Sequence, residues 1–219
     1  MTIELLNMDC MDYLRDCEDN AFDLAIVDPP YGINWTKSIS YSEKQEIHQN
    51  KKGYKSHVNK KWDEQKPSGE YFSELKRVSA NRIIWGGNYF SEYLPSSRCW
   101  IVWDKMCEDF TAINNELAWT SFDKKIKTFK RPHGMDKGFM SNSYHIHPTQ
   151  KPVKLYDWLL SNYAKEGDRI LDTHLGSGSS AIAAHYGQFD FVGIEIDEDY
   201  YKAACERFEK ETAQLDLLA

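Results

Sequence analysis

A carboxylate, two prolines and an aromatic ring follow one another at Asp28, Pro29, Pro30 and Tyr31. They come directly after the apolar run 24–27, which predicts a buried strand with this motif at its tip. The prolines fix the backbone and lack N–H donors, so a carboxylate, carbonyl acceptors and a flat ring share one stiff loop. Such a set can accept the N–H groups of an exocyclic amine and aim the nitrogen lone pair at an electrophile. An ordinary turn after a strand is the alternative.

A glycine-rich turn lies between a predicted strand and an alanine-rich helix in the last third of the chain. Gly176 and Gly178 follow the strand predicted at 169–172 and allow a tight turn and a close approach to a ligand. Glu195 comes 23 residues after Asp172, at the end of the next predicted strand, where a carboxylate can accept hydrogen bonds from ribose hydroxyls. A tight turn without a ligand is the alternative. Glycines and Glu195 together favour a cofactor that contains adenosine.

Asp9 follows the first predicted strand and precedes a short helical stripe of apolar residues. A carboxylate here could accept the amine of an adenine, but it is equally suited to cap the helix, and both interpretations stay open. His145 and His147 form an H-x-H pair without an evident third ligand, and the five cysteines contain no C-x-x-C pair. No metal site is therefore predicted.

The overall composition limits the classes of protein to consider. The chain has 219 residues, of which 41% are hydrophobic, and is long enough for one domain with a sizeable core. No apolar run approaches the ~18 residues of a membrane span, and the N-terminus lacks a signal-peptide pattern. The cysteine usage fits a reducing cytoplasm. The net charge of −7 argues mildly against a nucleic-acid partner unless positive charge is local.

Positive charge is concentrated in two segments with few apolar residues. Residues 32–62 contain seven lysines against two glutamates, with Tyr41, Tyr54 and Trp62 among them. This segment is either a solvated insertion or a loop that contacts a polyanion and stacks its rings on bases. The second basic segment, 124–142, is also predicted to be a loop. The candidate DNA contacts are Lys51, Lys52, Lys55, Lys60, Lys61, Lys130 and Arg131.

Strand-like apolar runs alternate with helical stripes along the chain. This alternation predicts an α/β fold with a mostly parallel sheet and helices on both faces. Seven strands are expected, and the last two should be parallel neighbours because a helix connects them. The predicted strands are 2–6, 22–27, 82–85, 100–103, 116–122, 169–172 and 191–197. In such sheets ligands bind at the edge where the parallel strands end, which is where the motif at Asp28 is predicted to lie.

The order of these motifs resembles that of prokaryotic and phage DNA amino-methyltransferases, which transfer a methyl group from S-adenosylmethionine to adenine N6 or cytosine N4. The resemblance covers most of the chain and rests on three segments. These are D-P-P-Y at 28–31, H-P-T-Q-K-P at 147–152 and the glycine loop after R-I-L-D at 169–172. W-I-V-W-D-K at 100–105 and E-L-A-W-T at 116–120 also resemble segments of the family. A catalytic loop that precedes the cofactor loop resembles the family's permuted β arrangement. The resemblance implies a Rossmann-like fold.

The resemblance also implies a domain organisation and residue roles. One catalytic domain, 1–219, would carry an insertion at 32–62 and a short target-recognition region at 123–145. The loop Asp28, Pro29, Pro30 and Tyr31 would bind the target base. The implied cofactor-binding residues are Asp9, Thr149, Lys151, Asp172, Gly176, Ser177, Gly178 and Glu195, with Thr149 and Lys151 at the methionine carboxylate. The family usually has Pro-Phe after the strand aspartate, whereas this chain has Thr173-His174.

The expected activity is site-specific methylation of adenine N6 in double-stranded DNA after base flipping, in a bacterial or phage restriction-modification setting. D-P-P-Y is more typical of adenine enzymes, and a cytosine-N4 enzyme is the alternative. Two further alternatives are a catalytically silent DNA-binding protein with this fold and a methylase of RNA or another amine. Expected partners are S-adenosylmethionine and duplex DNA; a second subunit and a cognate restriction endonuclease are further candidates. A cytoplasmic location and no membrane contact are expected.

Overall fold

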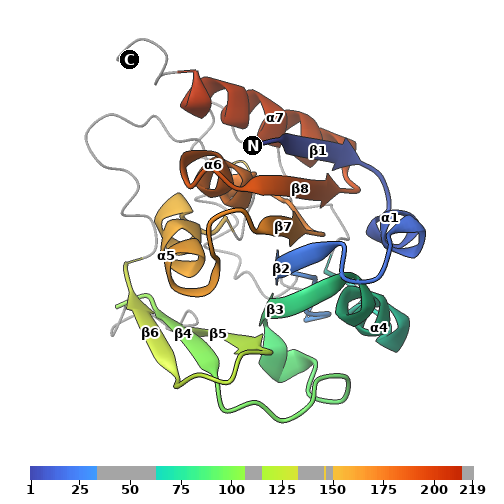
Figure 1. Cartoon of the computed structure of the whole chain (residues 1–219), viewed down its shortest axis with the longest axis vertical. Helices are drawn as coiled ribbons and strands as arrows, with labels where there is room; N and C mark the ends of the chain where they lie inside the picture. Colours follow the sequence, from blue (N-terminus) through green and yellow to red (C-terminus); the bar gives the residue numbers. More distant parts are fainter. Residues whose placement is uncertain (34–62, 107–114, 133–145, 147–149, 214–219) are drawn as a thin grey trace, which may run out of the picture.

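A computed structural model of the chain describes residues 1–33, 63–106, 115–132, 146 and 150–213 (Figure 1). Within these residues eight strands form one sheet in the order β1-β8-β7-β2-β3-β5-β4-β6. The strands are β1 (Ile3–Asn7), β2 (Phe22–Val27), β3 (Ser79–Trp85), β4 (Trp100–Asp104), β5 (Asn115–Thr120), β6 (Lys127–Lys130), β7 (Arg169–Asp172) and β8 (Asp190–Glu195). The helices are α1 (Cys10–Asp16), α4 (Gly69–Val78), α5 (Val153–Tyr163), α6 (Ser179–Tyr186) and α7 (Glu198–Thr212), with a 3-10 turn η2 (Gly87–Tyr89).

The predicted mostly parallel sheet is confirmed, but the predicted number of seven strands is wrong. The additional strand is β6, which lies in the segment predicted as a loop at 124–142 and pairs in parallel with β4. An edge strand needs little apolar surface, and in β6 Phe129 packs against Trp158 with ring centroids 5.6 Å apart. The lysines at both ends of β6 made this segment resemble a solvated loop in the sequence.

Strands β2 and β7 join the first and last parts of the chain at the centre of the sheet. They pair in parallel, with Leu24 opposite Ile170 and Ala25 opposite Leu171. The predicted pairing of the last two strands, β7 and β8, is also confirmed and is parallel. Because β2 and β7 run in the same direction, Asp28 just after β2 and Asp172 at the end of β7 lie at the same edge of the sheet.

Helices cover both faces of the sheet (Figure 1). On one face α5, α6 and α7 bury residues such as Leu155, Ala183 and Ala204 against the strands. On the other face α1 and α4 bury Leu14 and Leu75. Central strands covered on both faces need apolar side chains in both directions, which explains why β2 and β8 are nearly continuous apolar runs. None of the helices described is both long and apolar enough to cross a membrane.

One strand of the sheet runs against its neighbours. β5 pairs antiparallel with both β3 and β4, so its first residues lie at the edge where β2 and β3 end. β4 runs antiparallel to β5 and therefore ends at that same edge. The start of β5 and the residues just after β4 are thus carried to the place where the parallel strands present their tips.

Candidate active site

Two donors bind the carboxylate of Asp28. The hydroxyl of Tyr31 donates to Oδ1 at 2.7 Å, and the ammonium of Lys151 donates to Oδ2 at 2.5 Å. Lys151 is the lysine of the H-P-T-Q-K-P segment and lies just before α5, with a side chain only 3% exposed. The structure therefore brings D-P-P-Y and this lysine together. The position differs from the methionine-carboxylate contact that the resemblance implied for Lys151.

Lys151 belongs to a chain of charges that reaches beyond Asp28. It pairs with Glu116 at 3.0 Å, and Glu116 pairs with Lys105 at 2.6 Å. Burial opposes the charge of Lys151, but the carboxylates of Asp28 and Glu116 outweigh it and raise the pKa of the ammonium. Burial also opposes ionisation of Glu116, yet Lys151 and Lys105 lower its pKa to about 2. Glu116 and Lys151 are therefore both charged at neutral pH.

Glu116 and Lys105 were not predicted as site residues. Glu116 is the second residue of β5, and Lys105 follows β4 directly. In the sequence Glu116 precedes an apolar run and Lys105 follows Asp104 after another, which is a common pattern at strand ends. Only the antiparallel course of β5 brings Glu116 to the edge of the sheet where β2 ends. The available signal was their place in E-L-A-W-T and W-D-K, two segments that resemble the family.

The ring of Tyr31 is held in a tight aromatic environment. It stacks on Tyr89 with centroids 5.0 Å apart and an interplanar angle of 17°. Gly86, at the end of β3, has a φ of +67°, and a Cβ there would lie 2.3 Å from Cε1 of Tyr31. The absence of a side chain at Gly86 therefore leaves the space that the Tyr31 ring occupies. The sequence predicted Gly86 only as the end of a strand.

Asp63 fixes the backbone of the same loop. Its Oδ1 accepts the N–H of Tyr31 at 2.8 Å and the N–H of Gly32 at 2.9 Å. Pro29 and Pro30 have no N–H, so these are the first two backbone donors after Asp28. Asp63 is 5% exposed, and nothing in its local sequence marked it as part of the site.

A cavity lies beside the catalytic loop. Its wall includes the predicted cofactor residues Asp9 and Glu195, Pro30 of the D-P-P-Y motif, and Tyr71 and His174. It extends from the start of α1 across the start of α4 to the residues after β7 and β8. The cavity therefore adjoins the D-P-P-Y loop and Thr173 and His174, the residues that lead into the glycine loop.

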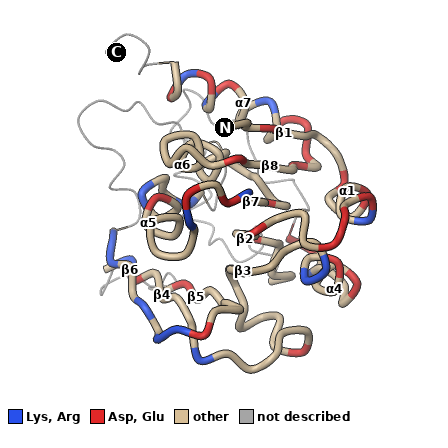
Figure 2. Tube along the Cα trace, in the orientation of Figure 1, with Lys and Arg blue, Asp and Glu red and all other residues tan. Residues whose placement is uncertain are grey.

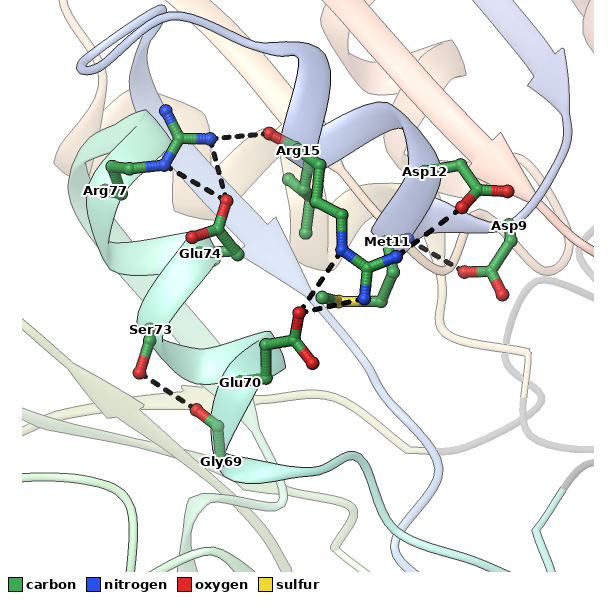
Figure 3. Close-up of polar contacts among 10 residues, drawn as sticks. Asp9, Met11, Asp12, Arg15, Gly69, Glu70, Ser73, Glu74 and Arg77 are labelled. Atoms are coloured by element: carbon green, nitrogen blue, oxygen red, sulfur yellow. Dashed lines mark hydrogen bonds and ion pairs between the residues drawn. The ribbon is translucent and has the colours of Figure 1, made fainter.

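Asp9 caps α1 and lines the cavity. Its Oδ1 accepts the N–H of Met11 at 2.8 Å, which confirms the helix-cap interpretation (Figure 3). In the same view Arg15 of α1 reaches Glu70 of α4, with Nη2 and Oε1 2.8 Å apart. This pair links the two helices that border the cavity. A contact from Asp9 to an adenine amine stays a prediction, and the cap leaves its Oδ2 for that role.

Glu195 is anchored by the glycine loop. Its Oε2 accepts the N–H of Gly176 at 2.8 Å, and its Oε1 accepts the N–H of Asp197 at 2.9 Å. Burial is the main cause that raises the pKa of this carboxyl. Gly176 has a φ of +52°, a left-handed conformation that a glycine adopts without strain. The loop thus sets where the Glu195 carboxylate meets the cavity.

Asp172 binds residues on both sides of the glycine loop. Its Oδ2 accepts the hydroxyl of Ser180 at 2.6 Å and its Oδ1 accepts the N–H of His174 at 3.0 Å. Burial raises the pKa of Asp172 to about 7. Gly178 has a φ of +75°, and a Cβ on it would lie 3.3 Å from that of Ala204. Among the described residues, the cavity wall does not include Asp172, Gly176, Ser177, Gly178 or Lys151. Their direct contact with a cofactor stays a prediction.

His174 stands where the family usually has phenylalanine. Its Nδ1 lies 2.9 Å from Oγ1 of Thr173, which in turn lies 2.7 Å from the hydroxyl of Tyr71. The Tyr71 and His174 rings meet edge to face, with centroids 5.5 Å apart. Burial lowers the pKa of His174 to about 4, so the imidazole is neutral at physiological pH. A neutral flat ring therefore remains in the wall of the cavity.

Thr149 and most of the predicted DNA contacts lie outside the described residues. The DNA contacts concerned are Lys51, Lys52, Lys55, Lys60 and Lys61. Lys130 is exposed at the end of β6, and the backbone N–H of Arg131 donates to the carbonyl of Asp104 at 3.0 Å. Figure 2 shows basic positions along and beside β6, whereas the segment from β1 through α1 is mostly acidic. Local positive charge therefore exists on an acidic chain.

The class of protein is that of Rossmann-like S-adenosylmethionine-dependent methyltransferases. Its features here are the mostly parallel sheet covered on both faces, the glycine loop after β7 and the acidic residue that ends β8. The motif D-P-P-Y at the tip of the neighbouring β2 fits the branch that modifies amino groups of bases. Residues 36–206 match the N6/N4 family of DNA methylases, and the chain belongs to that family.

Comparisons with individual proteins agree with this family. The chain is 25% identical to the type II methyltransferase M2.DpnII of Streptococcus pneumoniae, over 94% of this chain and 90% of the relative. Its fold is similar to that of the M1.HpyAVI complex with S-adenosylmethionine (TM-score 0.58, 17% identity, 94% and 100% coverage). It is also similar to the cytosine-N4-specific PvuII DNA methyltransferase (TM-score 0.61, 13% identity, 97% and 91% coverage). The chain is an S-adenosylmethionine-dependent DNA methyltransferase.

Proposed function

We propose that this methyltransferase modifies N6 of adenine in double-stranded DNA after the base has been flipped out of the helix. The observation that carries the proposal is the placement of Asp28. Its carboxylate follows β2 directly, shares a stiff loop with the carbonyls of Pro29 and Pro30, and adjoins the cavity through Pro30. An amine bound by these acceptors lies next to the place where a methyl donor fits.

The residues of the cavity fit S-adenosylmethionine. This cofactor supplies a methyl group bonded to a positively charged sulfur. Asp9 and Glu195 place two carboxylates in the wall, which suits a cation and ribose hydroxyls, and Tyr71 and Met8 add aromatic and apolar surface for a purine. Glu195 is the proposed ribose contact and Asp9 the proposed adenine contact. Gly176 of the glycine loop holds the Glu195 carboxylate in position, and the N–H of Met11 holds that of Asp9.

Asp28 would make the amine nucleophilic by hydrogen bonding. The nitrogen lone pair of adenine N6 is delocalised into the ring, so the amine is a poor nucleophile in the free base. Two acceptors on its N–H groups favour a nitrogen whose lone pair points at the methyl group. The same acceptors gain strength as positive charge develops on the nitrogen, which is when stabilisation accelerates the reaction. The Tyr31 ring, which stacks on Tyr89, is the proposed contact for the flat surface of the base.

The aspartate of D-P-P-Y is also the feature that favours adenine over cytosine. The acceptor chemistry suits N4 of cytosine as well, so the product decides. We expect duplex DNA incubated with the protein and labelled S-adenosylmethionine, then digested to nucleosides, to contain N6-methyldeoxyadenosine. N4-methyldeoxycytidine in its place would assign the enzyme to the cytosine branch. DNA binding without any methyl transfer would instead favour a silent DNA-binding protein.

The role of Asp28 is tested by Asp28→Ala and Asp28→Asn. Both variants should bind S-adenosylmethionine in calorimetry with nearly the affinity of the wild type and should lose methyl transfer. Asp28→Asn keeps the shape of the side chain and separates loss of charge from loss of packing. Turnover near the wild-type rate in either variant would remove Asp28 from the mechanism.

The proposed DNA contacts come from the two basic segments. The insertion 32–62 would approach the duplex with its five candidate lysines, and region 123–145, which includes Lys130 and Arg131, would contribute to target recognition within one catalytic domain, 1–219. Phosphate contacts orient the duplex without reading its sequence. Sequencing of methylated DNA from cells that express the chain gives the recognition site.

We also propose a bacterial or phage setting in the cytoplasm, as part of a restriction-modification system. Support comes from the similarity to type II methyltransferase M2.DpnII. A homodimer and a cognate restriction endonuclease are the proposed protein partners. Light scattering with and without duplex DNA measures the oligomeric state. Cleavage of unmethylated but not methylated DNA by an extract of the source cells tests for the endonuclease.

A further inference from the structure

We infer that Lys151 is a positioning residue for the carboxylate of Asp28, and that Glu116 limits how strongly Lys151 binds it. The inference rests on the proposed function, because it takes Asp28 as the group that binds the target amine. It assigns to Lys151 a role at the base rather than at the methionine carboxylate of the cofactor. Glu116 enters as a further residue of the catalytic machinery.

Two carboxylates and an aromatic ring lie close to the Lys151 ammonium in the described part of the chain. The Nζ atom lies 2.5 Å from Oδ2 of Asp28 and 3.0 Å from Oε2 of Glu116. It also lies 5.2 Å from the centroid of the Trp85 ring, in the range of a cation–π contact. The ammonium therefore donates a hydrogen bond to Asp28, forms an ion pair with Glu116 and contacts the face of the Trp85 ring. A cofactor carboxylate would have to displace a carboxylate from a side chain that is 3% exposed.

Lys151, which also pairs with Glu116, leaves Asp28 able to accept further hydrogen bonds. Each carboxylate oxygen can accept two hydrogen bonds. Asp28 receives one on Oδ1 from Tyr31 and one on Oδ2 from Lys151. Within the described residues, each oxygen therefore keeps one acceptor site for the N–H group of an amine. Lys151 fixes the orientation of the carboxylate, while the hydroxyl of Tyr31 fixes its other oxygen.

Glu116 makes this arrangement usable for catalysis. If Lys151 had Asp28 as its only anionic partner, the full attraction of the ammonium would fall on the acceptor that the amine needs. Glu116 takes part of that attraction, and Lys105 at 2.6 Å keeps Glu116 ionised. The four side chains Asp28, Lys151, Glu116 and Lys105 alternate in sign. The Lys151 ammonium thus orients the Asp28 carboxylate, while Glu116 balances part of its charge.

The test separates base positioning from cofactor binding. The variants are Lys151→Met, Lys151→Arg and Glu116→Gln. Lys154→Met is the control, because Lys154 lies three residues further on, in α5, with a side chain 68% exposed. Calorimetry measures the dissociation constant for S-adenosylmethionine, and single-turnover assays at saturating cofactor measure the rate on duplex DNA. Thermal unfolding reports whether each variant is folded.

We expect all variants to bind the cofactor within a few-fold of the wild type. The transfer rate should fall by up to about 100-fold in Lys151→Met, because a displacement of about 1 Å of a group that positions a substrate can cost that much. Lys151→Arg should recover part of that loss, and Glu116→Gln should reduce the rate less than Lys151→Met does. A large rise in the dissociation constant of Lys151→Met, with an unchanged rate at saturation, overturns the inference and restores the cofactor role.

Two further outcomes keep the inference testable. If Lys151→Met does not fold, unchanged rates in both Lys151→Arg and Glu116→Gln overturn the inference, whereas reduced rates with unchanged cofactor affinity support it. If the wild type itself transfers no methyl group to DNA, the proposed function fails first. Transfer by the wild type together with wild-type rates in all variants defeats this inference alone.

Discussion

The carboxylate of Asp63 accepts the backbone N–H of Tyr31 at 2.8 Å, across 32 positions of sequence. The same oxygen accepts the N–H of Gly32, so the catalytic loop is fixed at its backbone as well as through its side chains. Two prolines make the loop stiff, and Asp63 determines where that stiff unit lies relative to the cavity. If this loop binds the target base, its geometry depends on the Asp63 carboxylate as well as on the motif itself.

Asp63→Ala should lower the rate of methyl transfer at saturating cofactor and leave cofactor affinity nearly unchanged. The variant leaves two backbone donors without their acceptor, at a cost of about 1–3 kcal/mol in the free energy of unfolding for each donor that water does not reach. Asp63→Asn retains a carbonyl acceptor and should be less affected in both measurements. Urea unfolding and single-turnover assays provide the data, and equal rates for Asp63→Ala and the wild type would contradict the assignment.

Gly86→Ala should inactivate the enzyme without abolishing cofactor binding. Its Cβ would lie 2.3 Å from Cε1 of Tyr31, so the ring must move away from Tyr89 and from Asp28. Gly167→Ala is a matched control because Gly167 also has a positive φ, +85°, but has no atom within 4 Å of the added Cβ. Both variants carry backbone strain of about 1–3 kcal/mol. Only Gly86→Ala should lose activity, and similar rates in the two variants would contradict the prediction.

Glu195→Ala should weaken binding of S-adenosylmethionine by an order of magnitude or more. The substitution removes the proposed ribose acceptor and also the carboxylate that receives the N–H groups of Gly176 and Asp197, and a hydrogen bond to a charged group contributes about 1.5–3 kcal/mol. Glu195→Gln keeps one acceptor and should be intermediate. Glu198→Ala, at an exposed position nearby on α7, is the control. Calorimetry that shows the same dissociation constant in Glu195→Ala and the wild type would exclude the ribose contact.

His174→Phe should change how stability depends on pH. Burial lowers the pKa of His174 from 6.5 to about 4, so the unfolded chain binds a proton that the folded protein excludes between these values. This side chain therefore contributes stability above pH 6.5 that is lost as the pH falls toward 4. Phenylalanine lacks this titration. Urea titrations measure the free energy of unfolding of the wild type and of His174→Phe. The wild-type value minus the variant value should decrease from pH 6.5 to pH 4. A constant difference would show that the imidazole is not buried in its neutral form.

Lys130→Gln should weaken DNA binding equally for all sequences. An exposed lysine at the end of β6 that contacts a phosphate releases about one counterion, so the slope of log affinity against log salt should decrease in magnitude by about one. Lys210→Gln on α7 is the control, because α7 lies at the opposite end of the sheet from β6 (Figure 1). Fluorescence anisotropy at several salt concentrations measures both slopes. An unchanged slope for Lys130→Gln would place the duplex elsewhere.

The sequence was sufficient for the parts of the site that follow directly from strands. A buried strand leaves a dense apolar run, and the residues after it must lie at the tip, so Asp28, Asp172 and Glu195 could be placed without coordinates. The glycines of the cofactor loop were recognisable because few other residues allow such a turn. The edge strand β6 has too weak an apolar pattern to be predicted, and its one aromatic ring, the partly buried Phe129, was not enough to indicate it.

The tertiary structure alone decided which charges meet. Glu116 and Lys105 lie near the catalytic loop only because β5 runs antiparallel to β3 and β4 runs back beside it. Lys151 lies on Asp28 because β2 is adjacent to β7, which brings together two segments 123 residues apart. Local propensity and apolar periodicity determine elements and their tips. Ion pairs between elements depend on strand order and direction, which arise from packing of the whole chain and leave no local pattern in the sequence.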